Sequence, residues 1–154
     1  MKKLLIPALL LVSLASCGRR PSEPVPPAAA VDDRDTFQIQ WLAADVPQRV
    51  SRGAQFSAKA SFVNNGPNPL SVRQLAISYH WSEAADPKKV AVWEGARTVV
   101  TRPVSPGETY TADVRITAPG TPGRYRIDID LVREGVAWFS AKGATPFRAE
   151  VTVD

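Results

Sequence analysis

The sequence is poor in the side chains that build metal sites and disulfides. Its 154 residues include one cysteine, Cys17, and one histidine, His80. A structural zinc site or an iron–sulfur cluster needs several cysteine or histidine ligands, and a disulfide needs two cysteines. These sites are therefore excluded within the chain, and we expect no cofactor and no metal. No nucleophile motif accompanies His80, so we predict that the protein is not an enzyme.

Long hydrophobic runs are also scarce. Residues 4–16 carry no charge and follow Lys2 and Lys3. As a helix they would measure about 20 Å, which is shorter than the roughly 30 Å hydrocarbon core of a membrane. A basic start, an apolar stretch and small residues before residue 17 are typical of a secretory signal. We therefore predict that residues 1–16 are a signal peptide.

The end of this segment reads Leu14-Ala15-Ser16-Cys17. It resembles the lipobox of bacterial lipoproteins, and the alternative is an ordinary signal peptide that carries a cysteine by chance. The resemblance implies cleavage before Cys17, a diacylglycerol thioether on its sulfur and an acyl chain such as palmitate on its amine. Two or more chains anchor a protein stably. Gly18, in place of an aspartate, implies the outer membrane in a cell with two membranes, and otherwise the outer face of the cell membrane.

The basic balance of the chain is smaller than it first looks. Nineteen Lys and Arg against fifteen Asp and Glu make +4, but Lys2 and Lys3 would leave with the signal peptide and reduce it to +2. We therefore expect no nucleic-acid partner.

Residues 17–35 hold four prolines and three consecutive alanines. This composition predicts a disordered tether of roughly 55 Å when extended.

From residue 36 to residue 154 apolar and polar side chains alternate with a period of two, which predicts strands with one buried face. Turn-forming sequences separate them, and weaker strands are expected at 90–93, 97–101 and 136–140. This pattern predicts a single all-β domain, an antiparallel β-sandwich of about 7–9 strands, with a closed barrel as the alternative. The six alternating sets begin at Phe37, Phe56, Leu75, Tyr110, Tyr125 and Phe147.

Three short motifs carry a family resemblance for this domain. They are Val63-Asn64-Asn65-Gly66, Val104-Ser105-Pro106-Gly107-Glu108 and Pro122-Gly123-Arg124-Tyr125. Together they resemble the immunoglobulin-like modules of bacterial surface proteins that are called CARDB-like. The resemblance implies an immunoglobulin-like sandwich, and the position of Tyr125 at the start of its strand is that of a tyrosine corner.

The candidate contact residues are aromatic. Trp138 and Phe139 are adjacent, so a regular strand buries one and exposes the other, and Trp93 ends a short strand at a rim. Exposed tryptophans suit a protein hot spot or sugar stacking. Asp128 and Asp130 alternate with arginines, which predicts an exposed, charge-paired strand face instead of a metal or catalytic pair.

These observations favour a lipid-anchored, non-enzymatic module of the cell envelope that binds another envelope protein. Free strand edges would serve such a partner through β-augmentation. The alternative is a glycan-binding module that uses Trp93 with Trp138 or Phe139, which requires exposed and roughly coplanar rings. A second alternative is an unrecognised enzyme with His80 as its base.

Overall fold

The computed structural model describes residues 37–154. The predicted signal peptide, Cys17 and the predicted tether lie outside the described residues, so the predictions for them stay predictions. No helix in the described part is long and apolar enough to cross a bilayer. The elements are β1 (Ile39–Ala44), β2 (Arg49–Val50), β3 (Gln55–Asn64), β4 (Leu75–Glu83), β5 (Val90–Val92), β6 (Thr98–Val99), β7 (Thr109–Thr117), β8 (Gly123–Arg133), β9 (Ala137–Trp138), the 3₁₀ turn η1 (Ser140–Lys142) and β10 (Phe147–Val153).

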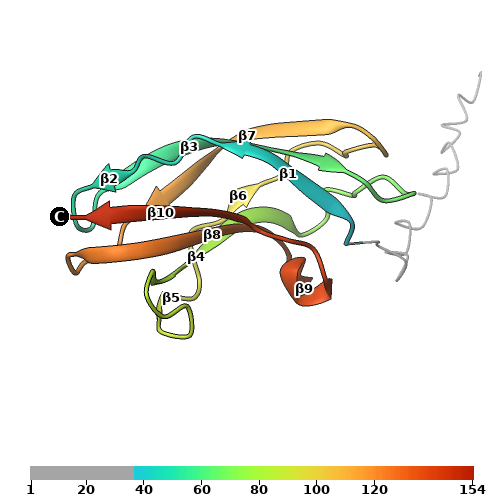
Figure 1. The fold of residues 1–154 in the computed structure, drawn as a ribbon. Helices are drawn as coiled ribbons and strands as arrows, with labels where there is room; N and C mark the ends of the chain where they lie inside the picture. The colour runs from blue at the N-terminus through green and yellow to red at the C-terminus, as the bar shows by residue number, and fades with distance from the viewer. Residues whose placement is uncertain (1–36) are drawn as a thin grey trace, which may run out of the picture. The chain divides into compact units, whose positions relative to one another are not determined.

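The strands form two sheets, which pack as the two layers of Figure 1. The small sheet has the order β1-β3-β7. The large sheet has the order β2-β10-β8-β4-β5, with β6 also paired to β4 and β9 to β8. The prediction of an all-β sandwich is therefore confirmed, whereas the finer immunoglobulin-like assignment stays a prediction.

The core lies between the sheets and follows the alternation of the sequence. Ile77 and Trp81 of β4, Phe62 of β3 and Ile127 of β8 are fully buried. Each such side chain contributes about 1.5–3 kcal/mol when it leaves water. The indole Nε1 of Trp81 donates to the carbonyl of Thr117 at 3.0 Å, which ties the large sheet to β7 across the core.

One strand was not expected from the sequence. The strongly and weakly alternating segments predict nine strands, and residues 37–154 contain ten, because β2 has only two residues and is too short to show a period. The chain leaves the small sheet after β1, and β2 then pairs with Thr152 and Val153 of β10 in parallel. This pair is an exception to the predicted antiparallel arrangement.

Candidate functional site

The outer face of the large sheet carries a row of polar residues where a solvated strand face was predicted. In the register of β4 with β8, Ser78 lies opposite Asp130 and His80 lies opposite Asp128. These side chains point away from the core, because Tyr79 between them points into it. The segment after β5 and the strand β9 bring further side chains onto this face.

His80 contacts two tryptophans. Its ring stacks on Trp93 with centroids 4.2 Å apart and planes inclined by 18°, and its centroid lies 4.1 Å from that of Trp138. Nδ1 of His80 hydrogen-bonds the carbonyl oxygen of Trp93, and since that oxygen can only accept, Nδ1 carries a hydrogen. Nε2 is buried and has no hydrogen-bond partner in the described part of the chain. We call His80, Trp93, Trp138 and Arg97 the tryptophan–histidine cluster.

Arg97 covers the other tryptophan of the cluster. Its guanidinium carbon lies 5.0 Å from the ring centroid of Trp138, within cation–π range. Nε pairs with Glu134 at 2.5 Å, and Nη2 pairs with Glu94. Burial lowers the pKa of Arg97, but the hydrogen bonds and charges of Glu134 and Glu94 outweigh it and raise that pKa above its usual value. Arg97 is therefore a fixed cation at the rim of the cluster.

Asp130 corrects the prediction of an exposed charge row. Its side chain is fully buried, and the start of η1 reaches it from the segment that follows β9. Its carboxylate accepts hydrogen bonds from the backbone N–H of Leu131 at 2.8 Å and of Ser140 at 3.0 Å. Burial raises the pKa of Asp130, and these hydrogen bonds only partly oppose the shift.

Asp128 follows the prediction of cross-strand charge pairing more closely. Its carboxylate lies 2.8 Å from Nε of Arg126 and 3.4 Å from Nε of Arg148 on the neighbouring β10. Asp128 and Asp130 thus belong to separate networks. Among residues 37–154, no group of three or more His, Cys, Asp and Glu side chains is placed to hold a metal ion.

The adjacent aromatic pair divides between the core and the outer face, although β9 ends at Trp138 and Phe139 has the αR backbone that begins η1. Phe139 is fully buried and packs edge-to-face against Phe37, with centroids 4.8 Å apart, so its ring belongs to the core. Trp138 is partly buried on the outer face, and Trp93 remains 56% exposed. The rings of Trp93 and Trp138 are inclined by 59°, so they do not form the coplanar platform that the glycan alternative requires.

Two exposed valines extend the apolar surface beside the cluster. Val99 of β6 is 62% exposed. It belongs to a row of paired residues that runs across four strands to the cluster: Val99, Ala76, Val132 and Trp138. Val136, in the turn before β9, is 61% exposed. Sequence reasoning missed Arg97 and Val99 as parts of this surface, because only the pairing of β6 with β4 places them there.

No protein-family model matches the chain, and no curated protein matches it. Solved structures with similar chains include the Pseudomonas fluorescens alkylpurine DNA glycosylase AlkC bound to abasic-site DNA, with 13% identity over 75% of this chain and 30% of that one, and a TM-score of 0.46. A β-glucosidase from Listeria innocua in complex with glucose shows 14% identity over 75% and 16%, with a TM-score of 0.46. The sporulation control protein Spo0M of Bacillus subtilis shows 12% identity over 76% and 49%, with a TM-score of 0.44. The chain spans less than half the length of each of these three.

Proposed function

We propose that the chain is a lipid-anchored, non-enzymatic module of a bacterial cell envelope that docks another envelope protein through the tryptophan–histidine cluster. The observation that carries this proposal is that Trp93 is both exposed and held in a fixed position. Its side chain is 56% exposed, yet its ring is stacked on His80 and its carbonyl oxygen is hydrogen-bonded by the same histidine. An aromatic side chain held in one position loses little entropy when a partner covers it.

The surroundings of Trp93 have the composition of a binding hot spot. Tryptophan and arginine dominate such hot spots, and an apolar centre with a charged rim is the usual arrangement. Here the exposed Val99 and Val136 extend the apolar part, and the ion pairs of Arg97 with Glu94 and Glu134 form the rim. The cluster therefore offers an apolar surface that a partner can bury and polar groups that can orient this partner.

The environment of His80 supports a binding role over a catalytic one. A general base needs a free ring nitrogen within reach of its substrate. Nδ1 of His80 is already bonded to the carbonyl of Trp93, Nε2 is buried, and two tryptophan rings lie against the imidazole. The histidine thus supports the position of Trp93 as a structural partner.

The anchor is tested separately through Cys17. The Cys17→Ser variant should lose all labelling by radioactive palmitate, because the thioether and the acylated amine both depend on the cysteine. The tether variant Ser22→Ala, produced at the same level, should keep the label. Continued labelling of Cys17→Ser would show that the lipobox interpretation is wrong.

The partner is tested by photocrosslinking in intact envelopes, with a benzophenone amino acid at position 136 beside the cluster. We expect discrete adducts with another protein, and Trp93→Ala should reduce them about thirtyfold, since a hot-spot residue contributes about 2 kcal/mol or more. Leu42→Ala is the matched control, because Leu42 is 52% exposed but lies on β1 of the other sheet. Adducts with lipid and the chain itself only, or equal adducts in both variants, would contradict the proposal.

A further inference from the structure

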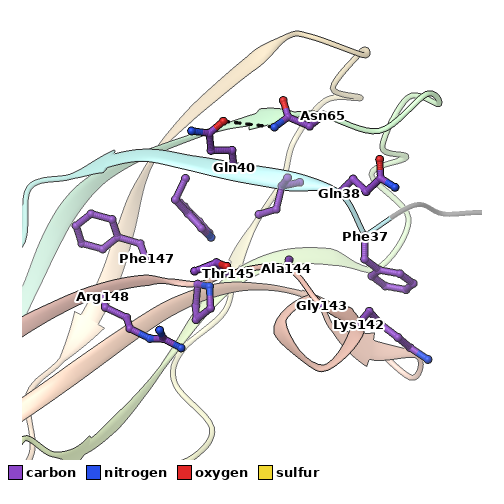
Figure 2. A pocket seen from close by; sticks show the side chains of 13 residues that line it. Phe37, Gln38, Gln40, Asn65, Lys142, Gly143, Ala144, Thr145, Phe147 and Arg148 are labelled. Carbon is purple, nitrogen blue, oxygen red and sulfur yellow. Dashed lines mark hydrogen bonds between the residues drawn. The ribbon is translucent and has the colours of Figure 1, made fainter.

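The sandwich is open along one side, between β1 and β10. The chain crosses from the small sheet to the large sheet at residues 45–48, so β2 covers only the last part of β10. Beside the first part of β10 a groove of about 800 Å³ separates it from β1. Figure 2 shows Phe147 and Arg148 of β10 on one side of this groove and Gln38 and Gln40 on the other, with the side chain of Gln40 directed to Asn65 and not toward β10.

Both walls of the groove present unpaired strand edges. The backbone N–H groups of Thr152 and Asp154 donate to the carbonyls of Gln48 and Val50, away from β8. Peptide groups alternate in direction along a strand, so those of Arg148 and Glu150 face the same edge, where no strand of the described chain lies beside them. A free edge of this kind is a template for one more strand.

The opposite wall repeats this arrangement. The carbonyl of Gln38 accepts from the N–H of Asn65 of the neighbouring chain segment, which places Gln38 and Gln40 on the paired side of β1. The alternation then turns the peptide groups of Ile39 and Trp41 toward the groove. Nε1 of Trp41 is also buried, and it has no hydrogen-bond partner among residues 37–154. An incoming acceptor would satisfy this donor.

The charges on the groove are of one sign. Among residues 37–154, Lys142 and Arg148 are the charged residues that line it, and the other lining residues are uncharged. Arg148 is 53% exposed, although its Nε lies 3.4 Å from the carboxylate of Asp128. Lys142 is exposed and lies 6.0 Å from the ring centroid of Phe37. An anionic ligand is therefore favoured, and a second copy of this edge would bring like charges together.

We propose that this groove binds an extended acidic peptide segment of a partner protein, which adds a strand beside β10. The peptide backbone pairs with the free groups of Arg148 in the groove and of Glu150 just beyond its lining, where the Glu150 carboxylate is already paired with Arg124 at 2.8 Å. The carboxylates of the peptide approach Lys142 and Arg148, and its apolar side chains cover Trp41. This surface is distinct from the tryptophan–histidine cluster. The groove proposal and the cluster proposal can therefore fail independently.

The probe is the synthetic peptide acetyl-Val-Glu-Val-Thr-Val-Glu-Val-amide, added to the ¹⁵N-labelled full chain that carries Cys17→Ser. We expect amide shifts at residues 147–150 and at Ile39 and Trp41, with slowed hydrogen exchange at Arg148 and Glu150. The same peptide with lysines in place of its glutamates, or with methylated peptide nitrogens, should bind roughly tenfold more weakly or worse.

A charge-reversal pair tests the electrostatic part. Lys142→Glu should weaken binding of the acidic peptide roughly two- to tenfold and improve binding of the lysine peptide. Lys88→Glu makes the same change of charge outside the groove and should leave both affinities unchanged. Equal binding of the three peptides, shifts confined to the Trp93 face, self-association of the chain through these residues, or no shift at all would overturn the proposal.

Discussion

The adjacent pair Trp138 and Phe139 allows a direct test of which side chain belongs to the core. Phe139 is fully buried and packs against Phe37. Removal of a buried phenylalanine ring costs about 3–5 kcal/mol, through lost burial and the cavity left behind. Trp138 is larger but only partly buried. It contributes ring contacts with His80 and Trp93 and one cation–π contact with Arg97, together about 2 kcal/mol.

We therefore expect Phe139→Ala to destabilise the domain more than Trp138→Ala, although alanine replaces the smaller ring. Small domains lose about 1–3 kcal/mol of stability per molar urea. The urea midpoint should fall by about 2 M in Phe139→Ala and by about 1 M in Trp138→Ala. Far-ultraviolet circular dichroism measures both without relying on tryptophan emission. Phe139→Leu should recover most of the loss, and a larger loss in Trp138→Ala would refute the assignment of the two faces.

Three further substitutions test other parts of the fold. Gly95→Ala should cost about 2 kcal/mol or more, since its Cβ would lie 2.6 Å from the carbonyl oxygen of Tyr79; urea unfolding measures this loss. Tyr125→Phe should cost about 1 kcal/mol in the same assay, because it removes the hydrogen bond from the hydroxyl to the Thr121 carbonyl at 3.0 Å. Burial raises the pKa of Asp130 above 3.8, the ordinary pKa of an aspartate. Its contribution to stability is therefore fully present below about pH 3.8 and is lost as the pH rises through the pKa of the folded state. The unfolding free energy of the wild type relative to Asp130→Asn should therefore fall between pH 3 and pH 7.

Each of these predictions has an outcome that would contradict it, and the glycine substitution also has a matched control. Gly120→Ala should be near neutral, because no atom lies within 4 Å of an added Cβ there. An equal loss at both glycines would contradict the close approach at Gly95. A Tyr125→Phe variant as stable as the wild type would show that the hydroxyl contributes nothing. A stability difference for Asp130→Asn that is constant or rises with pH would show that the pKa of Asp130 is not raised.

Period-two alternation predicted the strands and their buried faces, because each strand must place one face in a core whatever its partners are. It also predicted that one of Trp138 and Phe139 is buried, and it left open which one. The pattern failed at Asp130, where the charges of β8 predicted a wet face. Local alternation says which side of a strand is outside the core, but a later segment can still reach that side, as the start of η1 does here.

The sequence by itself determined that the domain is all-β and how many residues precede it. It also showed that cysteine and histidine are scarce, which limits the chemistry of the chain. These properties depend on composition and on neighbours two residues apart, which any fold of this chain must respect. Only the tertiary structure decided which side chains and which strand edges are neighbours. The pairing of β4 with β8 and the return of β9 bring His80 to Trp93 and Trp138, and the crossing of the chain at residues 45–48 opens the groove beside β10. Such contacts join residues far apart in sequence, and strand register, which no local pattern specifies, determines them.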